Sequence, residues 1–150
     1  MTDAELDAEL VSALRERGQR VTMPRLVVHR LIRRRGGHVS PEQVHATLVG
    51  EHPGLSPATI YSTLELLEEL DVVRRVSTPR GGTLYDARRD QHHHVICRVC
   101  GRVQDVDAPV DTGAAERAAA AAGFSVDHGQ VALSGICREC AERGTAARTR

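Results

Sequence analysis

Four cysteines in two Cys-x-x-Cys pairs are the residues of this chain with the clearest chemistry. The pairs are Cys97–Cys100 and Cys137–Cys140, and the 150-residue chain has no other cysteine. Each pair places two thiolates at the tip of one tight turn, so two pairs brought together supply the four tetrahedral sulfur ligands of a structural Zn²⁺ site. Gly101, directly after the first pair, allows the backbone to turn beneath a bound metal.

Two other uses of paired cysteines fit the sequence less well. Disulfides belong to oxidising compartments, and the first residues of the chain show no secretory signal pattern. A redox Cys-x-x-Cys opens a helix after a buried strand, which is not the context expected for either pair. No apolar run approaches the length of a membrane span. We therefore expect a cytoplasmic protein without a membrane partner.

A histidine run just before the first cysteine pair predicts a second metal site. Alternate side chains of a strand share a face, so His92 and His94 can bind one ion while His93 points away. Asp86 precedes the run and Asp105 follows the first cysteine pair, so both can reach the same face. Mixed nitrogen and carboxylate ligands favour an exchangeable divalent ion over the all-thiolate Zn²⁺. The alternative is a solvated turn. A structural role is expected for the isolated histidines: His29, His45 and His52.

The first half of the sequence predicts helices followed by a β-hairpin. Helical spacing covers residues 5–17, and Thr22 with Pro24 can open a second helix that ends at Gly36. The segment Ser40-Pro41-Glu42-Gln43 is a capping box that opens a third helix ending near residue 50. A second Ser-Pro start at residue 56 opens a fourth helix that runs to about residue 70. Two β runs follow, at 72–76 and 83–86, joined by a Pro- and Gly-containing turn.

This order of elements is the layout of a winged helix-turn-helix domain, expected over residues 1–86. The fourth helix would bury Ile60, Leu64 and Leu67 and would present a polar cluster to the major groove of DNA. The cluster consists of Thr59, Tyr61, Ser62 and Thr63. Residues 11–80 hold eleven arginines against seven acidic residues, which also favours a phosphate-rich partner. The alternative is a small helical core whose capping residues happen to be polar.

The second half predicts a small α/β module over residues 87–143, with a disordered tail at 144–150. Strands are expected at 92–97 and 102–107, a helix at 112–122, and further strands at 124–128 and 130–136. A sheet this small would expose an edge that a second copy of the chain could cover. The sequence as a whole therefore predicts an α+β fold class and a homodimer.

Several of these residues together resemble the ferric uptake regulator (Fur) family of metal-dependent repressors. The matching motifs lie before the second helix, on the fourth helix and around both cysteine pairs. They are Arg20-Val-Thr-x-x-Arg25, Ser56-x-Ala58-Thr59-Ile60-Tyr61-x-Thr63-Leu64, His92-x-His94-x-x-Cys97-x-x-Cys100-Gly101 and the distal Cys-x-x-Cys.

The resemblance implies a DNA-binding domain, a dimerisation domain and a regulatory metal, Fe²⁺ or Mn²⁺, at the hinge between them. It assigns one ligand from the DNA-binding half to His38 and the others to Asp86, His92, His94 and Asp105. It matches Tyr61 to a base-contacting tyrosine and places Arg20 and Arg25 close to double-stranded DNA. It also assigns Cys97, Cys100, Cys137 and Cys140 to structural zinc.

Within the family, aspartates at 86 and 105 resemble the peroxide-sensing branch, whereas iron-sensing members tend to carry glutamates there. In that branch bound ferrous iron reacts with peroxide and oxidises a ligand histidine, and His38 and His92 match the oxidised positions. Iron-responsive repression without peroxide sensing is the alternative. Nickel sensing also stays open. A third site found in many relatives would be incomplete, with Gln91 and Thr112 at ligand positions although His93 and His128 are present.

Two other protein classes remain open on the residues alone. An enzyme could use His92 and His94 in a zinc hydrolase, or the cysteine pairs in a thiol oxidoreductase, but no His-Glu-x-x-His or equivalent supplies the expected general acid or base. A zinc-ribbon adaptor that does not bind DNA is the third class. We expect a regulator and not an enzyme.

Overall fold

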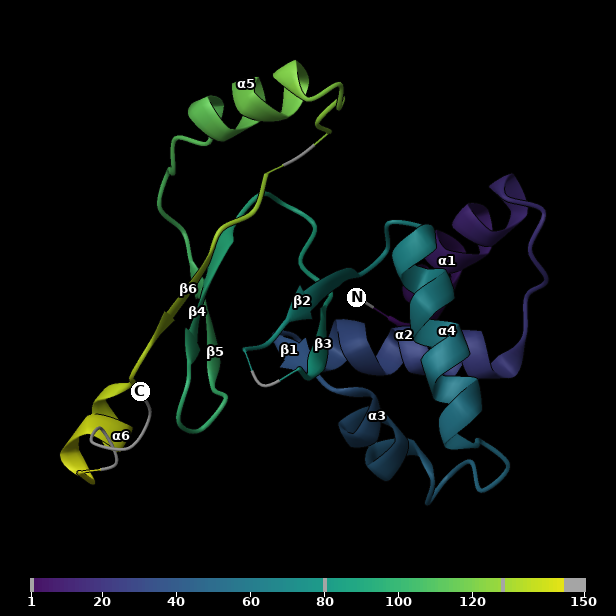
Figure 1. Ribbon diagram of the computed structural model, residues 1–150. Helices are drawn as coiled ribbons and strands as arrows, with labels where there is room; N and C mark the ends of the chain where they lie inside the picture. Colours follow the sequence, from purple (N-terminus) through teal and green to yellow (C-terminus); the bar gives the residue numbers. More distant parts are fainter. Residues whose placement is uncertain (1, 80, 128, 145–150) are drawn as a thin grey trace. The chain divides into compact units, whose positions relative to one another are not determined.

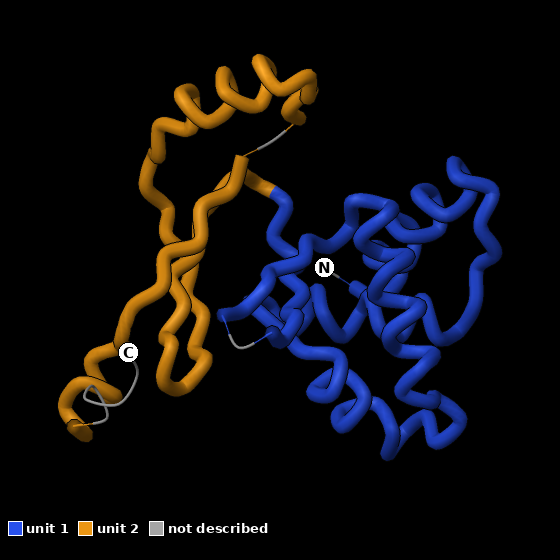
Figure 2. Tube along the Cα trace, in the orientation of Figure 1, with its two compact units in different colours: residues 1–89 blue, residues 90–150 orange. Residues whose placement is uncertain are grey.

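The chain forms two compact units, residues 1–89 and 90–150, in the computed structural model (Figure 2). The structure describes residues 2–79, 81–127 and 129–144. Four predictions lie partly or wholly outside these ranges: the tail at 144–150 from residue 145 onward, the last residue of the strand at 124–128, the third metal site at His128, and the hairpin turn at residue 80. In the described part of the chain, no helix has both the length and the apolar character to cross a membrane.

The first unit contains four helices and a small sheet, which confirms the expected mixed fold. The elements are α1 (Asp3–Glu16), α2 (Met23–Arg35), β1 (His38–Val39), α3 (Pro41–Leu48), α4 (Pro57–Glu69), β2 (Arg74–Ser77) and β3 (Thr83–Asp86) (Figure 1). The antiparallel sheet has the order β1-β3-β2. This arrangement is a winged helix-turn-helix, in which α3 and α4 form the helix pair and β2–β3 the wing.

The strands of the first unit differ from the prediction in two respects. The first hairpin strand begins at Arg74 and not at Val72, because Val72 and Val73 are buried after α4 and their amides donate to the carbonyl of Leu67. Strand β1 was not predicted. It is two residues long and pairs His38 with Asp86, a register that only the folded sheet defines.

Capping residues fix where the helices begin and end. Ser40 accepts from the amide of Gln43 at 3.2 Å, and the Gln43 side chain accepts from the Ser40 amide at 3.0 Å, as the capping-box motif predicts. Thr2 and Glu5 form a second box, so α1 begins two residues before the predicted start. Gly36 ends α2 at a φ of 63°, a backbone conformation that a side chain would strain.

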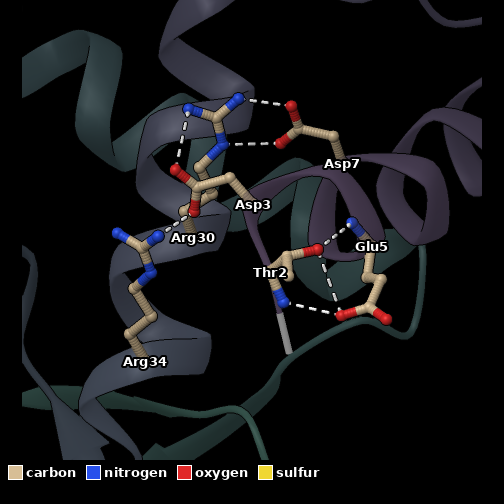
Figure 3. Close-up of polar contacts among 6 residues, drawn as sticks. All are labelled: Thr2, Asp3, Glu5, Asp7, Arg30 and Arg34. Carbon is tan, nitrogen blue, oxygen red and sulfur yellow. Dashed lines mark hydrogen bonds and ion pairs between the residues drawn. The ribbon is translucent and has the colours of Figure 1, made fainter.

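Acidic residues of α1 hold α2 through a cluster of ion pairs (Figure 3). Arg30 binds both oxygens of Asp7, with Nε to Oδ1 at 2.6 Å, and lies 3.9 Å from Asp3. Arg34 donates to Asp3 from the next turn of α2. The bidentate hydrogen bond from Arg30 lowers the pKa of Asp7, which keeps that carboxylate charged at neutral pH.

The core of the first unit is continuous and, apart from Tyr85, aliphatic. Helix α4 contributes Ile60, Leu64 and Leu67, all fully buried as predicted. Around them pack further apolar side chains from the four helices, the strands and the segments that connect them: Leu10, Leu14, Val28, Ile32, Val39, Val44, Leu48, Leu55, Leu66, Val72, Val73, Tyr85 and Ala87.

The described residues of the second unit, 90–127 and 129–144, form a three-stranded sheet and two helices. The elements are β4 (His93–Cys97), β5 (Val103–Val106), α5 (Gly113–Ala121), β6 (Ala132–Gly135) and α6 (Arg138–Glu142). Strand β4 lies in the centre, antiparallel to β5 and parallel to β6. The strand predicted at 124–128 is wrong for its described residues 124–127, which are irregular, and Phe124 is 70 % exposed. Helix α6 was not predicted.

Few apolar side chains are buried in the second unit. In its described ranges, 90–127 and 129–144, the buried apolar residues are Ile96, Cys97 and Cys140. Larger side chains such as Phe124 and Leu133 are more than half exposed. A core of this size needs further stabilisation, from a bound metal or a partner subunit.

Candidate metal centres and nucleic-acid interface

Both cysteine pairs converge at one end of the second unit. All four sulfur atoms lie within 4.8 Å of one another, and the Sγ atoms of Cys100 and Cys137 are 3.8 Å apart. Parallel pairing of β4 with β6 aligns Cys97 with Gly135, so the second pair follows directly beside the first. Gly101 turns the chain at a φ of 76°, and its amide donates to the carbonyl of Cys97 at 2.8 Å. No disulfide joins the four thiols.

The environment of these thiols suits metal binding. Backbone N–H groups, that of Cys100 first and that of Cys137 second, lower the pKa of Cys97 to about 5 by stabilising its thiolate. Burial raises the pKa of Cys140 to about 12. A thiol that is buried against a neighbouring thiolate loses its proton readily only when a cation replaces it. Four sulfur ligands at this spacing fit a tetrahedral thiophilic ion such as Zn²⁺.

In the first unit, His38 and Asp86 form half of the predicted regulatory site. Strands β1 and β3 pair these two residues directly, and His38 Nε2 lies 3.7 Å from Asp86 Oδ2. Both are largely buried, with side-chain exposures of 9 % and 1 %. The Asp86 carboxylate also accepts from the amide of Arg88 at 2.8 Å, which fixes its orientation. The sheet thus presents one imidazole nitrogen and one carboxylate oxygen together.

In the second unit, His92, His94 and Asp105 form the other predicted half. The Nε2 atoms of His92 and His94 are 3.1 Å apart, while His93 accepts from the amide of Val131. This confirms the predicted alternation along the strand. Register pairing of β4 with β5 sets Asp105 opposite His94, with its Oδ1 at 3.7 Å from His94 Nε2 and 3.9 Å from His92 Nε2. His92 is oriented by a 2.8 Å contact between its Nδ1 and the carbonyl of Asp90.

Both halves offer imidazole nitrogens and a carboxylate oxygen, one imidazole in the first half and two in the second. Two imidazole nitrogens that approach to 3.1 Å beside a carboxylate form a chelating set, and the contact of His92 Nδ1 with the carbonyl of Asp90 already holds that ring in one orientation. The nitrogen and oxygen donors of both halves fit a divalent ion such as Fe²⁺ or Mn²⁺ better than a thiophilic ion.

On helix α4, three of the four residues predicted to face DNA are accessible. Tyr61 and Ser62 are exposed and Thr59 is half-buried, where its hydroxyl contacts that of Ser56 at 2.9 Å. The prediction for Thr63 is wrong: this residue is 4 % exposed, because it lies on the inner face of the helix one position from Leu64. A threonine at a helical position between the two faces gives no signal of which side it takes.

The two arginines assigned to DNA lie before and within α2. Arg20 is exposed, and Arg25 donates to the carbonyl of Arg20 and approaches Gln19 Oε1 at 3.5 Å.

One contact between helices α3 and α4 was not predicted. The Tyr61 hydroxyl donates to Glu42 Oε1 at 2.5 Å, which links α4 to the start of α3. The sequence marked Glu42 only as part of the capping box.

Comparison with known proteins identifies the family of the chain. The ferric uptake regulator family matches residues 16–134 of the chain. The chain belongs to that family. Members of the Fur family are transcription regulators and not enzymes.

Relatives within the Fur family cover nearly the whole chain. The peroxide-responsive repressor PerR of Staphylococcus epidermidis is 28 % identical over 142 residues, 95 % of this chain and 94 % of the relative. The peroxide operon regulator of Bacillus subtilis is 27 % identical over 135 residues, 90 % of this chain and 93 % of the relative.

Solved structures of Fur-family proteins share the fold. The ferric uptake regulator of Helicobacter pylori superposes with a TM-score of 0.75 at 21 % identity and covers 94 % of this chain and 95 % of its own. A zinc uptake regulator in complex with zinc and DNA gives a TM-score of 0.67 at 27 % identity, covering 97 % and 99 %. The similarity to the Helicobacter pylori regulator shows a shared fold only.

Proposed function

We propose that the protein is a metal-dependent DNA-binding repressor that acts as a homodimer and senses peroxide. In this proposal one divalent ion, Fe²⁺ or Mn²⁺, is bound jointly by the two half-sites, and Zn²⁺ is bound by the four cysteines. The regulatory ligands are His38, Asp86, His92, His94 and Asp105. Residues 1–86 bind double-stranded DNA and residues 87–143 dimerise.

The observation that carries the proposal is the division of the nitrogen and oxygen ligands between the two units. His38 and Asp86 are paired across the first sheet, and His94 and Asp105 across the second, where His92 contacts His94. An ion that binds both sets favours the one arrangement of the units in which all ligands reach it. Only a dimer whose two helix-turn-helix domains have the right separation can occupy two half-sites on a duplex. Binding the ion therefore shifts the population towards the DNA-binding arrangement.

The proposed DNA-binding surface rests on α4 and on the arginines before it. Exposed Tyr61 and Ser62 lie on the first turns of the helix that a helix-turn-helix places in the major groove. The solved zinc uptake regulator of the same fold was captured with DNA.

Peroxide as the signal is supported by the chemistry of the ligand set and by the relatives. A site of imidazoles and carboxylates with fewer than six ligands leaves a coordination position for a small oxidant. With ferrous iron bound as the catalyst, peroxide would oxidise His38 or His92: a ring C–H bond would become C–OH, and the second peroxide oxygen would leave as water. The chain would then lose that ligand and its preference for the DNA-binding arrangement. Two relatives are described as peroxide regulators.

Replacement of His38 by Ala tests the hinge site. The variant should remain a folded, zinc-loaded dimer by analytical ultracentrifugation and metal analysis, yet lose metal-dependent binding to a duplex selected by the wild-type protein. His52→Ala is the matched control, because it removes an imidazole of the same unit outside the ligand set. Normal metal-dependent binding by His38→Ala would contradict the proposal.

Mass spectrometry after brief peroxide exposure separates peroxide sensing from its alternative. The iron-loaded protein should gain one oxygen atom on His38 or His92, and the manganese-loaded protein should not. Absence of the gain in both, together with intact iron-dependent DNA binding, would favour an iron-responsive repressor that uses the same five ligands without sensing peroxide.

A further inference from the structure

The contact between Tyr61 and Glu42 has a consequence for base recognition. Tyr61 is 42 % exposed on α4, and its hydroxyl lies 2.5 Å from Oε1 of Glu42 in the first turn of α3. Glu42 is itself exposed, and it is the second residue of its helix, where the positive helix end stabilises a carboxylate. The phenol and the carboxylate are therefore a hydrogen-bonded pair on the surface, with one residue from each helix of the helix-turn-helix.

A phenol has a single proton to donate, and an ionised carboxylate can only accept. When the Tyr61 hydroxyl donates its hydrogen bond to Glu42, its oxygen has only lone pairs left for any further partner. The hydrogen bond to Glu42 also lowers the pKa of that carboxyl and raises the pKa of Tyr61, so this arrangement persists across the neutral pH range. On the solvent-exposed side of α4, the side chains of this pair can therefore only accept hydrogen bonds.

We propose that Glu42 is a specificity-determining residue that restricts Tyr61 to accepting a hydrogen bond from an exocyclic amino group, adenine N6 or cytosine N4, in the major groove. These two amino groups are the hydrogen-bond donors that bases expose there, whereas guanine O6 and N7 and thymine O4 are acceptors. A phenol free to donate could bind those acceptors or a phosphate oxygen, and the Glu42 carboxylate removes both options. This inference rests on the proposed DNA binding and names the base chemistry that the helix recognises.

The first test needs no DNA. The chain has two tyrosines and no tryptophan, so the ultraviolet absorbance of tyrosinate follows Tyr61 and Tyr85 alone. Tyr61→Phe identifies which transition belongs to Tyr61, since burial raises the pKa of Tyr85 independently. Glu42→Gln should shift the Tyr61 transition to lower pH. An unchanged transition in Glu42→Gln would mean that the hydrogen bond is absent in solution, and the inference would fail whatever the protein binds.

The second test measures base discrimination. Manganese-loaded wild-type protein is used to select duplexes from a random library, and affinities for the selected duplex and its single-base variants are compared at one salt concentration. Failure to enrich any sequence would contradict the proposed function itself. If a sequence is enriched, the wild type should prefer adenine or cytosine at one position of each half-site by about tenfold. Purine in place of adenine, or 2-pyrimidinone in place of cytosine, removes only the amino group and should abolish that preference.

Glu42→Gln and Tyr61→Phe should both reduce discrimination at that position to about twofold or less, because either change ends the enforced acceptor role. Glu69→Gln is the matched control, since it makes the same charge change on exposed α4 surface at the other end of the helix. A uniform change of affinity for all duplexes in Glu42→Gln, equal to that in Glu69→Gln, would overturn the inference. So would a wild-type preference for guanine or thymine at the position that Glu42→Gln alters.

Discussion

The second unit should unfold when its cysteine site loses one thiolate. Three apolar side chains are buried among its described residues, and two of them, Cys97 and Cys140, are proposed metal ligands. Burial of the third, Ile96, contributes about 2–3 kcal/mol. A structural Zn²⁺ site contributes about 10–16 kcal/mol in small domains of comparable core size. The metal site therefore contributes several times more folding free energy than the apolar core. Cys137→Ser should remove most of the stability of this unit.

The assay can follow each unit separately. Both tyrosines, Tyr61 and Tyr85, lie in the first unit, so the tyrosine band of the near-ultraviolet circular dichroism spectrum reports that unit. Hydrogen exchange of β4 and β5 reports the second. Cys137→Ser should lose protection in both strands and keep the tyrosine signal, and treatment of the wild type with a strong chelator should do the same. Ser134→Ala, on exposed β6, should change neither signal.

The reasoning would be refuted if Cys137→Ser kept its exchange protection in β4 and its thermal transition in the metal-free state. That result would mean that contacts with a second copy of the chain, and not the metal, supply the missing stability.

Three further predictions concern the first unit, measured by urea unfolding with tyrosine fluorescence. Leu64→Ala should lower the free energy of unfolding by about 2–5 kcal/mol, because Leu64 is fully buried in α4. Ser40→Ala should cost about 1 kcal/mol through loss of the capping box with Gln43. Asp7→Asn should cost about 1 kcal/mol at neutral pH. Since Arg30 lowers the pKa of Asp7, this contribution is present above the ordinary aspartate pKa and is lost as the pH falls through the lowered value.

Controls separate these effects from general destabilisation. Val49→Ala, at a residue 39 % exposed, should change the free energy by less than about 0.5 kcal/mol. A cost for Asp7→Asn that stayed the same in strong acid would contradict the ion pair as its source. A Ser40→Ala variant as stable as the wild type would show that α3 is held by packing alone.

The local signals of the sequence were sufficient for most of the first unit. Capping motifs and helical spacing act over a few residues, so the box at Ser40, the Gly36 stop and the buried stripe at Ile60, Leu64 and Leu67 could be predicted without knowledge of the fold. Thr63 and the late start of β2 at Arg74 could not, because tertiary packing decides which face a threonine takes and where a chain leaves the core.

The sequence by itself also determined the ligand types: the spacing of the cysteines and the alternation of His92, His93 and His94 are properties of a turn and a strand. Only the tertiary structure decided which distant residues meet. Pairing of His38 with Asp86 depends on a two-residue strand that has no sequence signal, and pairing of Asp105 with His94 depends on register. The contact between Glu42 and Tyr61 also depends on tertiary structure, since two helices must pack before an exposed carboxylate can accept a hydrogen bond from an exposed phenol.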